Sequence, residues 1–316
     1  MTLTPRPAPP TRPARWASAM SLDYRRPEDG FLGLSAAEAA APERAGAVII
    51  PFGMEKTVSY GTGTARGAEA IIAASPELEF FDDELWCEPY RQFGIATLAP
   101  QSVAASAADA LDQLAALTGA ALDAGHFPLV LGGEHTLTAG AIRPFAARYP
   151  DLAVLHLDAH TDLRDSYEDN PLSHACAMRR VLDQGVEIVS AGIRAISAEE
   201  VPLLEATPQR VRVFWGRERA SWSLEEIVAP LRGRPLYVSL DIDVLDAGIM
   251  PATGTPEPGG LSFDEVCAVL RAASGASRIV GADLVELAPI PGFHAYDFTA
   301  AKLAYKLLAY ALTETG

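Results

Sequence analysis

The chain has few cysteines and no apolar run long enough to span a membrane. Its three cysteines, Cys87, Cys176 and Cys267, lie far apart in 316 residues. That odd number and wide spacing favour free thiols in a reducing cytoplasm over a disulfide framework. Residues 1–20 lack the apolar core of a secretory signal. We therefore expect a cytoplasmic protein that neither spans a membrane nor relies on disulfides.

Basic residues are scarce relative to acidic ones. The chain has 25 Lys and Arg against 41 Asp and Glu, which gives a formal net charge of −16. Such an excess of negative charge disfavours non-specific binding to nucleic acids and anionic membranes. It favours cationic small molecules or metal ions as partners, although a solvated acidic surface alone would also explain the composition.

Two common catalytic signatures are missing. The chain contains no G-x-S-x-G motif, and the glycines of residues 60–67 lack the G-x-G-x-x-G spacing of dinucleotide-binding loops. Residues 1–20 are rich in proline and arginine, and we expect a flexible N-terminal arm that packs on the surface or on another subunit. A transit peptide would have a similar composition. Residues 21–316 show no internal repeat and are expected to form a single domain.

Short β-rich runs alternate with helical patterns along the chain. Residues 103–124 and 299–313 have helical spacing, and Ser223-x-x-Glu226 and Ser262-x-x-Glu265 predict capping boxes that open helices. This alternation predicts βαβ units and a parallel sheet covered on both faces. In such sheets ligands bind at the carboxyl ends of the strands. The predicted strands are 46–51, 128–131, 152–157, 186–191, 211–214, 236–242 and 278–286.

Ionisable side chains follow three of these strands, and strand alternation places residues two apart on one face. Together they provide four carboxylates and two imidazoles, a set that would be untenable without cations. Two divalent ions would neutralise it, and mixed oxygen and imidazole ligation favours Mn²⁺, with Co²⁺, Fe²⁺ or Zn²⁺ as alternatives. The predicted ligands are His135, Asp158, His160, Asp162, Asp241 and Asp243.

Each of these motifs is weak alone, and their joint occurrence at strand ends is what makes the prediction specific. His156 shares the alternation but lies within its strand. We interpret it as a satisfied core histidine or as a residue that supports a ligand from behind.

Five segments together resemble the ureohydrolase family of arginases, agmatinases and their relatives. They are GGEHTLT (132–138), DAHTDLRD (158–165), SLDIDVLD (239–246), PATGTPEPGG (251–260) and DLVELAP (283–289). The resemblance covers roughly residues 45–312 and is strongest to agmatinases. It implies a three-layer α/β/α fold with a central parallel sheet, two Mn²⁺ ions per subunit, guanidino hydrolysis to urea, and a homo-oligomer, either a trimer or a hexamer. Residues 21–316 would then be one ureohydrolase catalytic domain.

The resemblance also implies how the ligands are shared. One metal would be held by His135, Asp158, Asp162 and Asp241, and the other by Asp158, His160, Asp241 and Asp243. A metal-bridging hydroxide would attack the guanidinium carbon, and Asp162 would pass its proton to the leaving amine.

Three further residues receive roles from the same resemblance. His174 would shuttle protons, Glu286 would pair with the substrate guanidinium, and Thr255 would lie near the substrate. Each has a plainer alternative: a surface-loop histidine, a structural carboxylate at a strand end, and a turn threonine.

The loop at residues 163–173 bears on the choice of substrate. It carries Asp165, Glu168 and Asp169 against Arg164, so its net negative charge favours a primary ammonium over a carboxylate. We therefore expect agmatine, cleaved to putrescine and urea, with Asp169 among the substrate-binding residues. Arginase or guanidinobutyrase activity is the alternative. A non-catalytic metal-binding relative and a mononuclear zinc deacetylase of related fold are further, less favoured readings.

Overall fold

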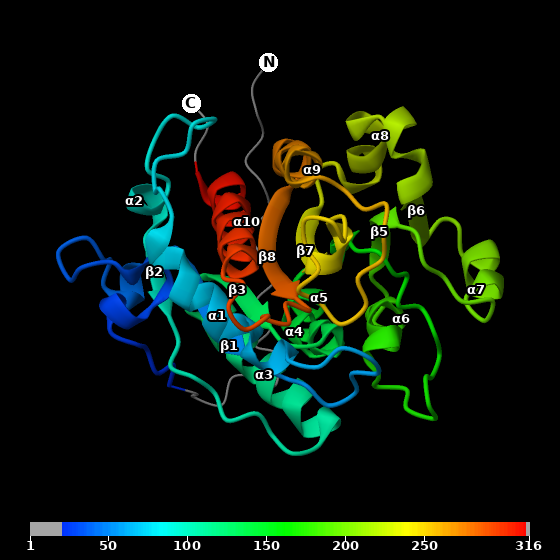
Figure 1. Cartoon of the computed structure of the whole chain (residues 1–316), viewed down its shortest axis with the longest axis horizontal. Helices are drawn as coiled ribbons and strands as arrows, with labels where there is room; N and C mark the ends of the chain where they lie inside the picture. Colours follow the sequence, from blue (N-terminus) through cyan, green and yellow to red (C-terminus); the bar gives the residue numbers. More distant parts are fainter. Residues whose placement is uncertain (1–20, 314–316) are drawn as a thin grey trace.

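One parallel sheet runs through the chain in the computed structural model, which describes residues 21–313. The predicted arm, residues 1–20, lies outside the described residues. The strand order is β2-β1-β3-β8-β7-β4-β5-β6, and every neighbouring pair is parallel (Figure 1). The strands are β1 Ala47–Phe52, β2 Ile95–Thr97, β3 Phe127–Gly132, β4 Ala153–Leu157, β5 Glu187–Ile193, β6 Val211–Trp215, β7 Pro235–Asp241 and β8 Arg278–Val285.

Helices cover both faces of this sheet. Side chains of α1 (Gly67–Ala74), α8 (Leu224–Val228), α9 (Phe263–Ala276) and α10 (Ala295–Leu312) join one hydrophobic core. The opposite core is built from α3 (Ala107–Asp123), α4 (Thr138–Ala141), α5 (Arg143–Arg148) and α6 (Ala177–Asp183). The predicted three-layer α/β/α fold is confirmed. Two short helices add to these cores: Tyr90 of α2 (Tyr90–Phe93) joins the first, and Leu203 and Leu204 of α7 (Val201–Ala206) pack against the second.

The strands are buried on both faces, as a parallel sheet between helices requires. In β4 all five residues are buried; Leu155 points into the core under α9 and α10, while Val154 points into the core under α3 and α5. A continuous apolar run of this kind fits a central parallel strand, and it leaves His156 as the one polar side chain in the strand.

The local predictions hold in part. Ser262 and Glu265 form the predicted capping box at α9, with both reciprocal bonds present. Ser223 is the N-cap of α8, but its side chain makes no cap hydrogen bond, so the second box is wrong. Strand β2 was not predicted, because its three residues are too few to show a pattern.

Four adjacent strands, β3, β8, β7 and β4, end at the same edge of the sheet. The register pairs Leu157 with Leu240, and Asp241 with Val285. Residues 158, 241 and 285 therefore lie at one level, although they are far apart in sequence.

Within the described part of the chain, no helix combines the length and apolar character needed to cross a membrane. The three cysteines are free thiols, as predicted.

Candidate metal centre

The six predicted ligands lie together at the carboxyl ends of β3, β4 and β7. His135 opens a short turn after β3, Asp241 is the last residue of β7, and Asp243 lies in the turn that follows it. The Asp241 carboxylate accepts the Asp243 N–H at 2.9 Å, which fixes that turn. All six side chains are buried except His160, whose side chain is 27% exposed.

Gly133 allows the chain to enter the site after β3. A Cβ at this position would lie 1.9 Å from the Met54 carbonyl oxygen, so no other residue fits without moving the backbone. The next residue, Glu134, accepts the N–H groups of Lys56 and Thr57 at 2.8 and 2.6 Å. These two hydrogen bonds join the loop after β1 to the loop that presents His135.

His135 faces three carboxylates. Its Nδ1 atom lies 3.1 Å from Asp158 Oδ2, 3.1 Å from Asp162 Oδ2 and 3.4 Å from Asp241 Oδ2. This nitrogen is buried and makes no well-directed hydrogen bond to any of the residues 21–313. Three carboxylate oxygens and this nitrogen thus face one another without a hydrogen bond between them. The space that they share is suited to a cation.

His160 forms the second half of the cluster. Its Nδ1 atom lies 3.0 Å from Asp243 Oδ2 and 3.6 Å from Asp158 Oδ1. Asp158 therefore faces both histidines, one with each carboxylate oxygen. Donor atoms of Asp158, His160 and Asp243 all lie within 4.8 Å of one another, which is compact enough to share one ion.

The charges in this cluster are strongly perturbed. Burial, reinforced by the neighbouring carboxylates Asp243 and Asp158, raises the pKa of Asp241 well above its usual range. Burial by itself would lower the pKa of His160, but Asp243 and Asp158 outweigh it and raise that pKa to about 12. Burial also opposes the charged form of His135, but Asp158, Asp162 and Asp241 outweigh it and raise the pKa of His135 well above its usual value. The carboxylates thus favour positive charge between them, which a metal ion supplies.

A hydrogen-bond relay orients the His135 ring. The Asp283 carboxylate accepts from Ser239 Oγ at 2.8 Å, from Tyr237 OH at 2.8 Å and from Thr138 Oγ1 at 3.0 Å. Because Ser239 gives its hydrogen to Asp283, its oxygen accepts from His135 Nε2 at 2.9 Å. The hydrogen on Nε2 leaves Nδ1 to face the carboxylates, a support typical of metal-binding histidines.

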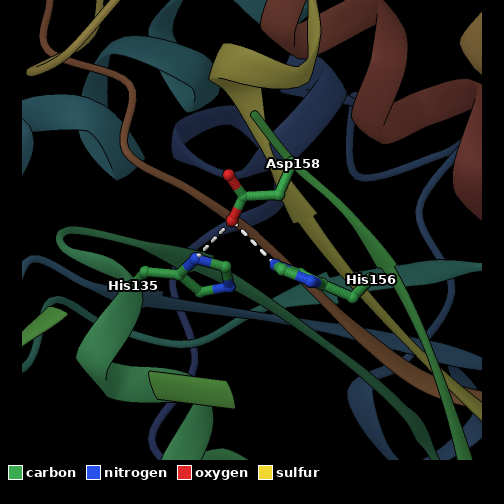
Figure 2. Close-up of side chains that lie close together, drawn as sticks. All are labelled: His135, His156 and Asp158. Carbon is green, nitrogen blue, oxygen red and sulfur yellow. Dashed lines mark hydrogen bonds and ion pairs between the residues drawn. The ribbon is translucent and has the colours of Figure 1, made fainter. Parts of the chain in front are cut away.

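His156 lies beside these groups but is already bonded at both ring nitrogens. Figure 2 shows the His135 and His156 rings pointing at the same oxygen of Asp158. His156 Nε2 contacts that oxygen at 2.7 Å, and its Nδ1 bonds Ser190 Oγ at 3.0 Å. His156 is close enough to His135 and Asp158 to share an ion with them. Its two bonds favour the interpretation that it supports Asp158 from behind.

Two carboxylates of the site have left-handed backbone. Asp162 has φ 51° and Glu286 has φ 65°, a conformation that costs a non-glycine residue about 1 kcal/mol or more. Glu286 follows β8, is 8% exposed, and accepts the His135 N–H at 2.6 Å. Burial raises its pKa to about 8. A buried carboxylate with that pKa gains from a cationic partner.

A cavity of about 280 Å³ opens over the cluster. His160, Asp162, Asp241, Asp243 and Glu286 form part of its wall. The predicted residues His174 and Thr255 also line it. His174 is held by Thr57, whose Oγ1 accepts the His174 N–H at 2.9 Å.

The structure does not bring Asp169 to this cavity. Glu168 and Asp169 form the tip of a tight turn, both with positive φ, between Tyr167 and Asn170, which exchange two backbone hydrogen bonds. Neither tip residue belongs to the cavity wall, whereas Tyr167 does. Asp165, the other acid of this loop, pairs with two arginines, Arg180 at 2.9 Å and Arg179 at 3.2 Å. The loop therefore faces the cavity with less negative charge than its sequence indicates.

Several residues of the site were not predicted. Asp283 was inside the predicted strand 278–286, and an acid within an apolar run is a signal that could have found it. Glu257 and Glu200 line the cavity, and Arg194 ties two of its loops together. Glu257 lies in the segment PATGTPEPGG, which marked the family resemblance but gave this residue no role, and no local pattern distinguishes Glu200 and Arg194 from other charged loop residues.

The fold and the site define a class: a parallel α/β/α protein with a buried carboxylate–imidazole cluster at its strand ends. A model of the arginase family matches residues 45–310. The chain is 38% identical over 279 residues to the N(1)-aminopropylagmatine ureohydrolase of Synechocystis sp., covering 84% of this chain and 89% of that one. It is 40% identical over 255 residues to the agmatinase of Bacillus anthracis, covering 78% and 85%.

Among solved structures, the agmatine ureohydrolase of Thermoplasma volcanium is similar with a TM-score of 0.80. It is 28% identical, and the match covers 93% of this chain and 96% of that one. The chain belongs to the arginase family. The predicted ureohydrolase relationship is confirmed, and with it a hydrolase that acts on guanidino C–N bonds.

Proposed function

We propose that this chain hydrolyses agmatine to putrescine and urea with two Mn²⁺ ions as cofactor. The observation that carries the proposal is the convergence of four carboxylates and two imidazoles on one cavity whose wall also contains the buried Glu286. The agmatinase and aminopropylagmatine ureohydrolase names of its relatives support a decarboxylated, cationic guanidino substrate.

The donor set supports two ions rather than one. His135 Nδ1 would bind the first, together with Asp158, Asp162 and Asp241. His160 would bind the second, with Asp158, Asp241 and Asp243. Asp158 is suited to a bridging position because it faces both histidines. Bound divalent ions lower the pKa of water and so supply a hydroxide nucleophile near neutral pH.

The residues around the ions have separate tasks in this proposal. The Glu286 carboxylate pairs with the substrate guanidinium and holds its carbon over the cluster. Asp162, in the cavity wall beside His135, accepts the proton of the nucleophile and passes it to the leaving amine. His174 exchanges that proton with solvent at the cavity mouth, and Thr255 contacts the substrate.

N(1)-aminopropylagmatine is a second candidate substrate. The observation that favours it is the 38% identity to an enzyme named for that compound. Both candidates end in an amine and lack the α-carboxylate of arginine, so both suit an acidic cavity. Arginine and guanidinobutyrate each carry a carboxylate, and the charge of the cavity wall disfavours them.

The test is urea release from Mn²⁺-loaded protein with agmatine, N(1)-aminopropylagmatine, arginine and guanidinobutyrate, run side by side. We expect the highest kcat/KM with agmatine. Asp241→Asn, which removes a carboxylate that would bind both ions, is the matched inactive control. No urea from any of the four substrates, with two metals bound, would show a non-catalytic relative. Arginine turning over fastest would overturn the choice of substrate.

We also propose a cytoplasmic homo-oligomer, a trimer or a hexamer. The three free thiols support the compartment. Light scattering on the full chain measures the oligomeric state, and a monomeric mass would contradict the proposal.

A further inference from the structure

Most charged groups in the cavity wall, outside the metal cluster and Glu286, already have partners. Arg164 pairs with Glu199 at 3.2 Å. Glu200 is 4% exposed, and its carboxylate accepts hydrogen bonds from the Thr161 hydroxyl, the Leu163 N–H and the Ser197 N–H. Glu257 differs, because its half-buried carboxylate makes no hydrogen bond or ion pair with any residue in the described range 21–313. It lines the cavity with a negative charge that is free to bind a ligand.

The backbone of Glu257 is held firmly beside the metal cluster. Arg194 donates to the Glu257 carbonyl at 2.7 Å and to the Asp243 carbonyl at 2.6 Å through one nitrogen, and to the Pro258 carbonyl at 3.2 Å through another. A guanidinium that spans both loops sets the distance between them. The Glu257 side chain therefore extends from an anchored position, and its carboxylate does not need to order a mobile loop when it binds a ligand.

We propose that Glu257 binds the distal ammonium group of the substrate. The inference rests on the proposed function, because it takes a guanidino compound with a second positive charge as the ligand. Glu286, deeply buried, faces the guanidinium, and Glu257, in the outer wall, faces the amine at the other end of the chain. A buried and a half-buried carboxylate in the wall of one cavity match a dication, and Glu257 repels a substrate that ends in a carboxylate.

The test compares agmatine with 1-butylguanidine, which has the same guanidino head and an uncharged end. In Glu257→Gln we expect kcat/KM for agmatine to fall about tenfold, mainly through KM, since a partly desolvated charged pair is lost. For 1-butylguanidine we expect a change of less than about twofold. Arg194 holds the Glu257 carbonyl and not its carboxylate, so the variant keeps the contacts that position the loop.

Glu226→Gln is the matched control. Glu226 is exposed on α8, is outside the cavity, and makes no side-chain ion pair among the described residues, so its substitution removes the same charge elsewhere. In this variant kcat/KM should stay near the wild-type value for both agmatine and 1-butylguanidine. Glu257→Asp should recover part of the preference for agmatine. A purely structural role would lower activity on both substrates alike.

The inference is overturned if Glu257→Gln changes kcat/KM for agmatine and for 1-butylguanidine by the same factor, or leaves both values unchanged. Failure of the proposed function has a different result, because wild-type protein would then release no urea from agmatine. The ratio of the two kcat/KM values therefore tests Glu257 only in an enzyme that is already active.

Discussion

Asp283→Asn tests whether the relay behind His135 prepares a metal ligand. Asparagine replaces two accepting oxygens by one oxygen and one NH₂ group. If the amide oxygen keeps the hydroxyls of Tyr237 and Thr138, the NH₂ group faces Ser239. Ser239 must then turn its hydrogen toward His135 Nε2, and the ring hydrogen moves to Nδ1, where it points at the metal position.

The size of the effect follows from the contacts that are lost. The opposite amide orientation would leave two buried hydroxyls facing donors, at a cost of about 1–3 kcal/mol each, so the first orientation should prevail. Altered support of a metal-binding histidine typically lowers affinity about 10- to 100-fold. We therefore expect the Mn²⁺ affinity of Asp283→Asn to fall about 10- to 100-fold. The free energy of unfolding of the metal-free protein should fall by about 1–3 kcal/mol.

Isothermal titration of metal-free protein with Mn²⁺ measures this effect directly. Tyr237→Phe is the control, because it removes one donor to Asp283 and leaves the bond between Ser239 and His135 in place. Its stability should fall by about 1 kcal/mol, while its Mn²⁺ affinity stays within about threefold of wild type. If Asp283→Asn binds both ions as tightly as wild type, the relay does not set the His135 tautomer and our reasoning is refuted.

Three further predictions test other parts of the molecule. Asp162→Asn should lower urea release by about 10²-fold or more, because it removes the proposed proton acceptor, and a near wild-type rate would contradict that role. Asp82→Asn should cost about 2 kcal/mol in chemical denaturation, because Lys306, 6% exposed, loses the nearest of its three acidic partners, at 2.9 Å, and keeps Asp83 and Glu84 at 3.6 Å. Burial opposes ionisation of Asp82, but backbone N–H groups and Lys306 outweigh it and hold its pKa below the usual value. The stabilisation is therefore present above about pH 4 and lost as the pH falls through the folded-state pKa, so equal slopes of stability against pH in the two proteins would refute it. In Gly61→Ala a Cβ would lie 2.8 Å from the Gly254 carbonyl oxygen. The substitution should push apart the loops of Gly61 and Gly254, whose residues Tyr60 and Gly254 line the cavity, and raise KM for agmatine several-fold. An unchanged KM would show that these two loops adapt to the added methyl group.

The amino-acid sequence by itself determined the layered fold and the composition of the site. Apolar runs and capping residues act over a few positions, so seven of the eight strands and the α9 capping box could be predicted. Alternation placed Asp158 and His160 on one face, and the rule for parallel sheets placed them with Asp241 at one edge. The structure has these residues within a few ångströms of one another.

Only the tertiary structure decided which distant residues meet. The insertion of β8 and β7 between β3 and β4 brings Glu286 and Asp283 to His135, across about half of the chain. The acidic character of residues 163–173 pointed to Asp169 as a substrate ligand, whereas a tight turn holds it away from the cavity wall. Glu257, to which the segment 251–260 gave no role, lines that wall, where Arg194 binds its loop to the loop of Asp243. Local patterns determine secondary structure and the face of a strand, but strand order and long-range pairing decide which charges are neutralised and which remain free for a ligand.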